Sequence, residues 1–337
     1  MQLGDRHGRV ATDLRVSLTD RCNLRCTYCM PAEGLTWLPT EDTLTDEEVN
    51  RLLRVAVERL GITKLRFTGG EPLLRPGLAG IIATSKTLRT IHGAPPETSL
   101  TTNGLGLDKR LDTLVSAGLD RVNISLDSLD RETYARLTRR DRLPDVLTAI
   151  EAAMAADLGP IKINSVVMRG ENESAVLPLA HFCLERGLQL RFIEQMPLGP
   201  RHEWVRSAMV TQTEILSQLE QDFALSPLDE PRGSAPAELW QIAPDETQPG
   251  GTIGVIASVT NPFCASCDRS RITSDGQVRT CLFSRTETDL RTILRSGGTD
   301  DDLAAAWLGA HADKRRGHGI DDPTFVPPER TMSAIGG

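Results

Sequence analysis

The sequence has no long hydrophobic run. Within its 337 residues, no stretch approaches the roughly 18 consecutive apolar residues that would indicate a membrane-spanning helix. The first ten residues, from Met1 to Val10, include charged side chains instead of the apolar core of a secretion signal. We therefore expect a cytoplasmic protein with no membrane segment.

An excess of positive charge is also missing. The chain has 38 Lys and Arg residues against 46 Asp and Glu residues, which gives a net charge of -8. A broad nucleic-acid-binding surface needs clustered Lys and Arg, so we expect no nucleic-acid partner. A compact anion is not excluded, because a few arginines in one pocket can neutralise a phosphate group whatever the total charge is.

Cysteine is sparse, and the seven residues cannot all pair in disulfides. In a reducing cytosol, grouped cysteines bind metal more often than they form disulfides. Six of them fall into two groups of three, and Cys183 is expected in the core of a helix. The first group is Cys22, Cys26 and Cys29, and the second group is Cys264, Cys267 and Cys281.

Each cysteine group lacks a fourth ligand nearby in the sequence. A structural zinc site normally has four protein ligands, and the histidine candidates are distant, namely His7 for the first group and His311 for the second. A cubane iron-sulfur cluster held by three thiolates leaves one iron open to a small molecule. We therefore favour two iron-sulfur clusters over two zinc ions.

Strand-like segments alternate with helical patterns, and no solenoid repeat or low-complexity tract is present. The clearest helical pattern runs from Thr45 to Leu60, with a capping threonine, a glutamate three residues later and Gly61 as a stop. This alternation implies parallel strands joined by right-handed crossovers. Six units predict an α/β fold, a partial, open (βα)6 TIM-type barrel. The expected strands are Leu14–Thr19, Lys64–Thr68, Ser99–Thr102, Arg121–Leu126, Ile161–Met168 and Leu188–Met196.

Distinctive motifs follow these strands. In parallel α/β folds, ligands bind at the carboxyl ends of the strands, and in a barrel those ends form one rim. We therefore expect the motifs to share one site. They are Cys22–Cys29, Gly69–Pro72, Thr101–Gly104, Ser125–Asp127 and Met196–Pro197.

The composition changes after about residue 224, where Pro, Gly and acidic residues become frequent. Short strands follow, and Arg271–Thr273 and Gln277–Thr280 are joined by a turn containing Asp275-Gly276, which favours a tight hairpin. We expect a barrel domain over residues 1–224 and a smaller cluster-binding domain over residues 225–337, which carries the second cysteine group.

The first two motifs resemble those of radical S-adenosylmethionine enzymes. The cysteines have the spacing Cys-x3-Cys-x2-Cys with Tyr28 before the last one, and Gly69-Gly70-Glu71-Pro72 follows one strand later. Either motif alone has a plainer reading, as a zinc loop or as a strand-to-helix turn. In the radical family, the open iron binds S-adenosylmethionine, and one electron from the cluster cleaves it to a 5'-deoxyadenosyl radical.

Over nearly its whole length, the chain resembles the GTP 3',8-cyclase family of molybdenum cofactor biosynthesis. The segments that carry this resemblance are Asp13–Pro31, Lys64–Pro72, Phe192–Pro197, Cys264–Cys281 and Met332–Gly337. The resemblance implies two [4Fe-4S] clusters, one on each cysteine group. It also implies S-adenosylmethionine contacts at Tyr28, Gly70, Ser125 and Met196.

The same resemblance implies the residues that bind and convert GTP. Arginine and lysine suit a triphosphate, and a charge between apolar neighbours, as at Lys162, faces either the pocket or the solvent by strand phase alone. A pair of glycines at residues 336 and 337 is thought to enter the active site in this family. The implied GTP contacts are Arg15, Arg66, Thr101, Lys162, Arg269, Ser270 and Arg271. The implied catalytic residues are Arg15, Arg269, Arg271, Gly336 and Gly337.

The implied reaction removes the 3' hydrogen of GTP and joins C3' to C8, which gives (8S)-3',8-cyclo-7,8-dihydroguanosine 5'-triphosphate. The resemblance also suggests a homodimer, an unidentified electron donor and a downstream cyclic pyranopterin monophosphate synthase. Two alternatives remain. One is a peptide-maturing radical enzyme, whose relatives commonly have more cysteines near the C-terminus, and the other is a zinc-stabilised module without catalysis.

Overall fold

A curved sheet of twelve strands organises the molecule. The computed structural model describes residues 1–156, 158–199, 204–246 and 248–336. Eight adjacent strands are parallel, and antiparallel strands extend both ends. The parallel strands, in spatial order, are β12 (Arg269–Ile272), β3 (Asp13–Ser17), β4 (Lys64–Thr68), β5 (Glu97–Thr102), β6 (Arg121–Ser125), β7 (Lys162–Val167), β8 (Gln189–Glu194) and β11 (Gly251–Ile256). The end strands are β13 (Gln277–Arg279) and β14 (Thr288–Asp289) beside β12, and β10 (Glu238–Ile242) and β9 (Leu225–Pro227) beside β11.

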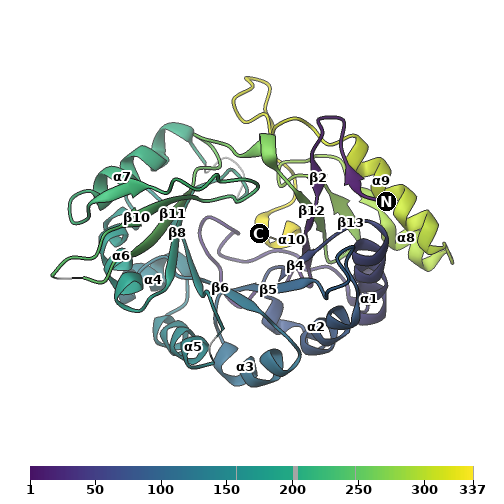
Figure 1. Cartoon of the computed structure of the whole chain (residues 1–337), viewed down its shortest axis with the longest axis horizontal. Helices are drawn as coiled ribbons and strands as arrows, with labels where there is room; N and C mark the ends of the chain where they lie inside the picture. Colours follow the sequence, from purple (N-terminus) through teal and green to yellow (C-terminus); the bar gives the residue numbers. More distant parts are fainter. Residues whose placement is uncertain (157, 200–203, 247, 337) are drawn as a thin grey trace.

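The expected open, partial barrel is confirmed, because the sheet curves without its two end strands pairing in the described part of the chain (Figure 1). The structure differs from the expectation in the number of parallel strands, which is eight instead of six. Strands β11 and β12, from the C-terminal part, pair in parallel with β8 and β3 and so cover the edges of the six expected strands. Bare strand edges are prone to pair with other chains, and these additions satisfy their backbone groups. The domain boundary at residue 225 stays a prediction.

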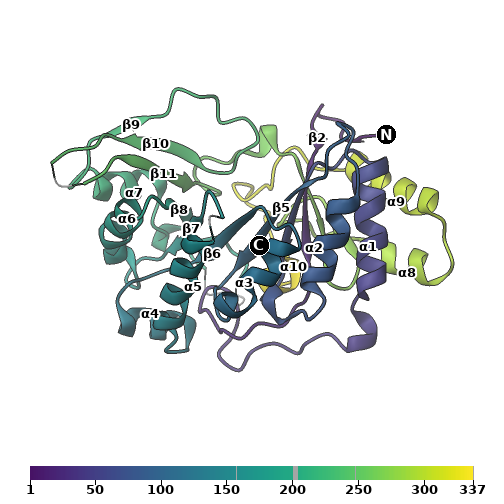
Figure 2. The same ribbon diagram turned by 60° about the horizontal axis from the view of Figure 1, so that its bottom comes forward.

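Helices cover the outer face of the sheet, as Figure 2 shows for α1, α2, α3 and α5. Helix α1 (Asp46–Arg54) begins with the expected capping box, in which Thr45 and Glu48 bond to each other's backbone, and a π-helical segment, Val55–Arg59, continues it. The other helices are α2 (Leu78–Thr87), α3 (Leu107–Ser116), α4 (Arg131–Thr138), α5 (Leu143–Ala155), α6 (Val176–Glu185), α7 (Gln212–Leu219), α8 (Leu290–Arg295) and α9 (Asp300–Ala312).

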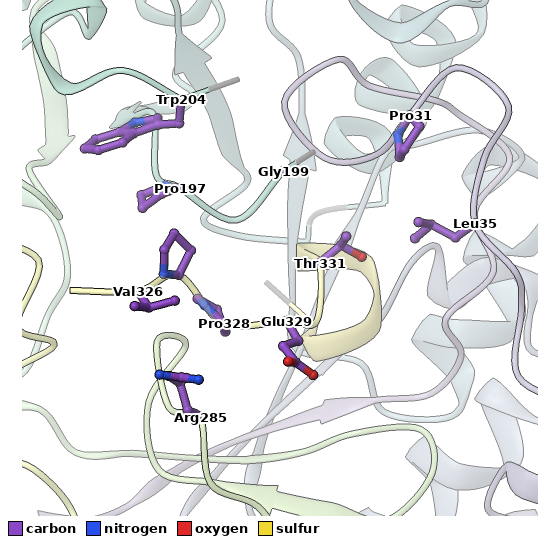
Figure 3. A pocket seen from close by; sticks show the side chains of 11 residues that line it. Pro31, Leu35, Pro197, Gly199, Trp204, Arg285, Val326, Pro328, Glu329 and Thr331 are labelled. Carbon is purple, nitrogen blue, oxygen red and sulfur yellow. The ribbon is translucent and has the colours of Figure 1, made fainter. Parts of the chain in front are cut away.

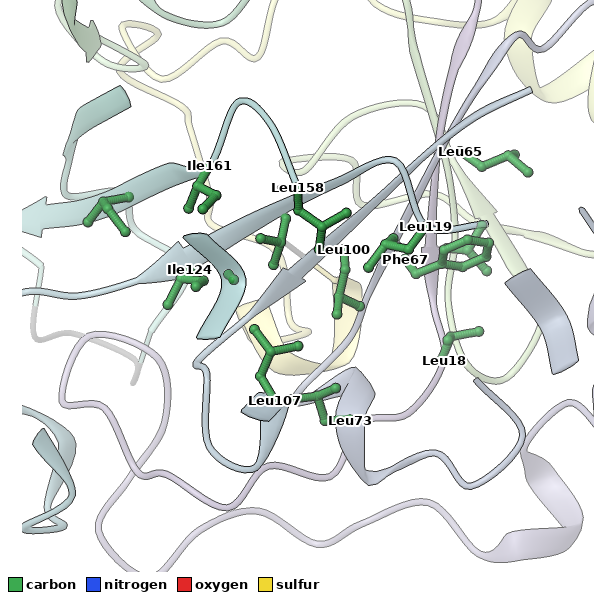
Figure 4. Packing of buried hydrophobic residues seen from close by; sticks show 14 of the residues in the cluster. Leu18, Leu65, Phe67, Leu73, Leu100, Leu107, Leu119, Ile124, Leu158 and Ile161 are labelled. Atoms are coloured by element: carbon green, nitrogen blue, oxygen red, sulfur yellow. The ribbon is translucent and has the colours of Figure 1, made fainter. Parts of the chain in front are cut away.

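The strands alternate between an apolar outer face and a polar inner face. On β4, Leu65 and Phe67 are buried, and they lie with Leu100 of β5 in the core between sheet and helices (Figure 4). Arg66 lies between them in sequence and therefore points to the opposite, concave face. A polar concave face has room for a charged ligand, unlike the apolar packed interior of a closed barrel.

The C-terminal part of the chain returns to this concave face. The short helix α10 (Met332–Ile335) lies inside the curve of the sheet (Figure 1). At the other end, a hairpin of β1 (Leu3–Gly4) and β2 (Val10–Ala11) precedes β3. No helix among the described residues is long and apolar enough to cross a bilayer.

Candidate active site

The first cysteine group lies in the loop after β3, and the end of α4 holds that loop. The backbone amides of Arg25 and Thr27 donate to carbonyls of α4 residues, at 3.0 and 2.9 Å. Arg139 follows α4 with φ of 54°, in the left-handed region that non-glycine residues rarely adopt. From there, its guanidinium donates to the Met30 carbonyl at 3.0 Å and to the Arg25 carbonyl at 3.2 Å.

The cysteines of the first group are partly buried and affect one another. Burial, and then the negative charge of the Cys22 thiolate, raises the pKa of Cys29 to about 12. Within the residues that the structure describes, no three His, Cys, Asp or Glu side chains are arranged as ligands of a single metal ion. In a cubane cluster, each thiolate binds a different iron, and the three thiols of this loop are of the residue type that such a cluster needs.

The Gly69-Gly70 pair packs directly on the backbone that leads into the cysteine loop. Gly69 has φ of 146°, and a Cβ there would lie 2.4 Å from the Thr19 carbonyl oxygen. A Cβ on Gly70 would lie 2.3 Å from the carbonyl oxygen of Arg21. Only glycine therefore fits at either position, and the Gly70 amide donates to the Thr19 carbonyl at 2.7 Å.

Glu71 fastens this glycine loop to the end of β5. Its buried carboxylate accepts from the Thr102 hydroxyl at 2.7 Å and from the Leu73 and Asn103 amides at 2.9 and 2.8 Å. Burial raises the pKa of Glu71 to about 7, although these three bonds favour the ionised form. The Asn103 side chain in turn lies 3.8 Å from the sulfur of Cys22, so strand β5 helps to set the cysteine loop.

A cavity of about 150 Å³ adjoins the first cysteine group. Its wall includes three of the four residues predicted to contact S-adenosylmethionine, Tyr28, Gly70 and Ser125, and also Thr101, predicted for GTP. The Tyr28 hydroxyl donates to Asp127 at 2.8 Å, and burial raises the pKa of that carboxyl to about 6. The fourth residue, Met196, lines a different cavity.

The second cysteine group lines a cavity of about 70 Å³, together with Met196, Arg269, Arg271 and His318. The His318 ring does not supply a free fourth ligand. Its Nε2 lies 3.0 Å from the Ser258 carbonyl oxygen, and its Nδ1 accepts from the Ile320 amide at 3.0 Å. Both ring nitrogens are thus engaged, so a cluster here would keep an open iron.

Neither histidine that the sequence left open as a zinc ligand is placed to act as one. His7 lies in the β1–β2 hairpin, and Arg9 of that hairpin donates to the Cys264 carbonyl of the second group, at 2.7 Å. The hairpin therefore does not serve the first group. The Nε2 of His311 lies 2.9 Å from the Ser270 hydroxyl, behind the sheet.

Arginines form a row across three neighbouring strands. Arg271, Arg15 and Arg66 are register partners on β12, β3 and β4, so they point to the same concave face. The Nε atoms of Arg15 and Arg66 are buried without a hydrogen-bond partner. Burial, and then repulsion from Arg269, lowers the pKa of Arg271 to about 10. Such crowded guanidiniums, two of them with an unpartnered Nε, favour an anionic ligand.

Further cations extend the row on β6, β7 and β8. Burial, and then repulsion from Arg191 and Arg121, lowers the pKa of Lys162 to about 7, which supports its expected inward direction. Arg121 and Arg191 are not among the cations expected from the sequence, although Arg191 also alternates with apolar neighbours on its strand. Nearby acids are Asp13, 3.7 Å from Arg66, and Glu97, paired with Arg121. We call the following set the cationic interior: Arg15, Arg66, Arg121, Lys162, Arg191, Arg269 and Arg271.

Ser270 is not brought together with these cations. It lies between Arg269 and Arg271 on β12, so its side chain points to the opposite face. There the buried hydroxyl accepts from the Trp307 indole at 2.9 Å and contacts His311, both on α9. The structure therefore gives the Ser270 side chain a role in joining helix α9 to the sheet.

Gly336 meets the cationic interior directly. Its carbonyl oxygen accepts from Arg271 at 2.6 Å, and a Cβ on Gly336 would lie 3.0 Å from side-chain carbons of Ser17 and Thr68. With φ of 82°, this position suits glycine alone. The other predicted glycine, Gly337, lies outside the described residues.

A larger cavity of about 570 Å³ contains neither the cysteines nor the cationic interior. Figure 3 shows Val326, Glu329 and Thr331 on the approach to α10, facing Pro197 and Trp204 after β8. Its wall is mainly apolar and rich in proline. The two cysteine groups, together with Arg269 and Arg271, line the smaller cavities instead.

This open α/β sheet, with a Cys-x3-Cys-x2-Cys loop after its first parallel strand in the sequence, defines a radical S-adenosylmethionine enzyme. Residues 16–183 match the Radical SAM superfamily, and residues 188–320 match the family described as Molybdenum Cofactor Synthesis C. The crystal structure of Streptococcus suis SuiB bound to S-adenosylmethionine has a similar fold, with a TM-score of 0.56 at 15% identity, over 86% of this chain and 65% of that chain.

The chain belongs to the GTP 3',8-cyclase family. It is 64% identical to the GTP 3',8-cyclase of Corynebacterium glutamicum, over 99% of this chain and 89% of that protein. It is 56% identical to the GTP 3',8-cyclase of Mycolicibacterium smegmatis, over 99% of this chain and 92% of that protein. Membership of the radical superfamily implies S-adenosylmethionine and an iron-sulfur cluster as cofactors.

Proposed function

We propose that this protein converts GTP to (8S)-3',8-cyclo-7,8-dihydroguanosine 5'-triphosphate, the first step of molybdenum cofactor biosynthesis. One observation carries the proposal beyond family membership. Arg271, in the wall of the second cavity, bonds to Gly336, and Gly336 lies against Thr68, in the wall of the first cavity. The two cysteine groups therefore border one interior, which is lined with cations.

The first cysteine group would hold the cluster that supplies an electron for cleavage of S-adenosylmethionine. The chain's own residues provide the surrounding wall. Tyr28, Gly70 and Ser125 line the cavity beside these thiols, which is where a bound S-adenosylmethionine would lie. The glycine pair keeps the loop close to the cysteine loop, because any larger residue would collide with the backbone of Thr19 or Arg21.

The cationic interior would hold the triphosphate. A guanidinium group can donate two parallel hydrogen bonds to the oxygens of one phosphate. The Nε atoms of Arg15, Arg66 and Arg269 have no hydrogen-bond partner and are therefore free to donate to phosphate oxygens. An anion there would relieve the repulsion that lowers the pKa values of Arg271 and Lys162. Positioning is the main contribution of these residues, because the radical would otherwise react with the wrong atom.

The second cysteine group would hold a second [4Fe-4S] cluster with an open iron for the guanine ring. Two features support this. Each histidine near the group is already hydrogen-bonded elsewhere, and Arg269 and Arg271 lie in the same cavity wall as the cysteines. The dimer, the electron donor and the downstream synthase stay predictions from the family resemblance, and the cytoplasmic location stays a prediction from the sequence.

An anaerobic assay tests the proposal. The reconstituted, reduced protein is incubated with S-adenosylmethionine and with GTP, ATP or a peptide in turn. We expect 5'-deoxyadenosine and a 3',8-cyclised product with GTP alone. Turnover of ATP or of the peptide without turnover of GTP would show that the assignment is wrong, and a colourless, zinc-loaded protein would support the non-catalytic module instead.

Cysteine variants separate the two groups. Cys264→Ala should retain the iron of the first cluster, lose that of the second and lose GTP cyclisation. Cys183→Ala is the matched control, because Cys183 is buried in α6 and belongs to neither group. It should keep the iron content and the activity of the original protein. Full cyclisation by the Cys264→Ala protein with only one cluster would contradict the substrate role of the second group.

A further inference from the structure

An arginine just before helix α10 makes two forked ion pairs with the hairpin of the second cysteine group. Arg330 donates to both carboxylate oxygens of Asp275, at 3.0 and 2.8 Å. Its Nε and second terminal nitrogen also lie 2.8 and 2.9 Å from the two oxygens of Glu287. Bidentate pairs fix direction as well as distance, so the guanidinium holds one orientation.

The acids of this network are themselves held in place. Asp275 lies in the turn between β12 and β13, where its Oδ1 also accepts from the Thr273 hydroxyl at 2.5 Å. Glu287 also pairs with Arg279 of β13, whose side chain is only 2% exposed. The Arg330 guanidinium is therefore bound to a rigid part of the sheet. This part is the hairpin that carries Arg271 on one strand and leads into Cys281 after the other.

Packing alone does not explain why the segment after Arg330 stays in the interior. We define the tail segment as residues 330–336. Thr331, at its beginning, borders the cavity of about 570 Å³, as Figure 3 shows, so one side of this segment faces open space. Its helix α10 has only four residues, too few to be stable alone. Other fixed points are the Met332 amide, bonded to the Leu198 carbonyl at 3.0 Å, and the buried Ser333 and Ile335.

We propose that Arg330 is a positioning residue for the GTP reaction, which clamps the tail segment to the Asp275 turn so that Gly336 reaches Arg271. The proposal rests on the proposed function and deepens it. Arg271 has no carboxylate within ion-pair distance among the described residues, so the Gly336 carbonyl is its fixed partner on this side. The clamp ties the tail segment to the strand that carries Arg271, and both therefore keep one relative position.

Substitution of Arg330 tests the clamp. Arg330→Gln removes the charge and both forks, whereas Arg330→Lys keeps the charge without the forked geometry. The matched control is Arg131→Gln, which breaks a forked pair with Asp141 on the exposed surface of α4. All variants are studied as the reconstituted holoenzyme, and their iron content is measured first.

Hydrogen exchange by mass spectrometry provides a readout that needs no substrate. In Arg330→Gln, we expect the amides of residues 332–336 to exchange at least about tenfold faster, while β13 keeps its protection. Arg330→Lys should fall between this variant and the original protein, and Arg131→Gln should match the original. Unchanged protection of residues 332–336 in Arg330→Gln would overturn the proposal.

Kinetics provide the second readout. We expect the KM for GTP to rise about tenfold or more in Arg330→Gln, with partial recovery in Arg330→Lys, and S-adenosylmethionine cleavage to become less coupled to cyclisation. A fall in kcat that only follows lost iron would indicate a merely structural role and would overturn the proposal, as would an unchanged KM. If the original protein does not turn over GTP, the proposed function fails, and the exchange experiment alone decides whether the clamp exists.

Discussion

The ammonium nitrogen of Lys314 lies 3.4 Å from the sulfur of Cys267. The same nitrogen donates to the carbonyls of Cys267 and Arg269, at 3.3 and 2.8 Å, and the residue is only 3% exposed. No carboxylate forms an ion pair with Lys314 in the described part of the chain. A buried ammonium without an acidic partner is costly, so the thiolates of the second group are its natural counter-charge.

We therefore predict that Lys314→Met lowers the reduction potential of the proposed second cluster. A hydrogen bond to a charged group contributes about 1.5 kcal/mol or more, which corresponds to a shift on the order of 60 mV for one electron. A redox titration followed by electron paramagnetic resonance measures the shift. Lys109→Met, at an exposed helix position, is the control. Equal potentials in the two variants would show that Lys314 does not act on the cluster.

Removing Arg191, a cation that the sequence alone did not indicate, should weaken GTP binding. The Arg191 guanidinium is largely buried, its Nε has no partner, and burial lowers its pKa to about 10. We expect Arg191→Gln to raise the KM for GTP by about tenfold or more, because one charge-assisted phosphate contact is lost. Steady-state kinetics measure this effect, and Arg89→Gln, at an exposed position, should leave KM unchanged. An unaltered KM in Arg191→Gln would place the triphosphate elsewhere.

GTP binding should take up a proton near neutral pH. Burial and the neighbouring Arg191, Arg121, Arg66 and Lys64 lower the pKa of Lys162 to about 7, and a bound triphosphate would raise it again. Above pH 7, the free protein then lacks a proton that the complex holds, so affinity should fall with rising pH, by at most about tenfold per unit.

Calorimetry in buffers of different ionisation enthalpy measures this proton uptake. The Lys162→Met protein should lose the pH-dependent part of the uptake, because the titrating group is gone. Folding should depend on pH as well. A lysine whose pKa is lower in the folded state makes the stability rise with pH, between about 7 and the usual lysine pKa of 10.5. Identical proton uptake in Lys162→Met and in the original protein would assign the effect to another group.

The glycine loop should not tolerate even one methyl group. A Cβ on Gly70 would lie 2.3 Å from the Arg21 carbonyl and 2.5 Å from the Asp20 carbonyl, and neither backbone atom can move freely. We expect Gly70→Ala to lose iron from the first cluster and to lower the melting temperature by about 5 °C or more. Gly80→Ala is the control, because nothing lies within 4 Å of the added atom on helix α2. Full iron content in Gly70→Ala would contradict this steric argument.

Local sequence patterns were sufficient for the parts of the fold that depend on neighbours in the chain. The capping box at Thr45 and the tight turn containing Asp275-Gly276 are satisfied by atoms only a few residues apart, and both occur as expected. The alternation of polar and apolar residues also predicted a strand around Lys162, and strand β7 forms there, because side chains on a strand alternate strictly between its two faces.

Other features depended on contacts between distant segments. The sequence did not show that β12 pairs with β3, and this pairing alone aligns Arg271 with Arg15 and turns Ser270 toward α9. Arg191 was not selected because an arginine between apolar residues has the same pattern whether it faces a pocket or the solvent.

The sequence by itself determined the chemistry of this protein. The spacing of the first cysteine group and the adjacent Gly69-Gly70 motif indicated the radical class, because thiolate ligands and a close backbone approach depend on residue type and local spacing. Only the tertiary structure decided where the charges meet. The cationic interior and the contact between Arg330 and Asp275 bring together residues from separate strands and turns. These contacts depend on strand register and burial, not on distance along the sequence.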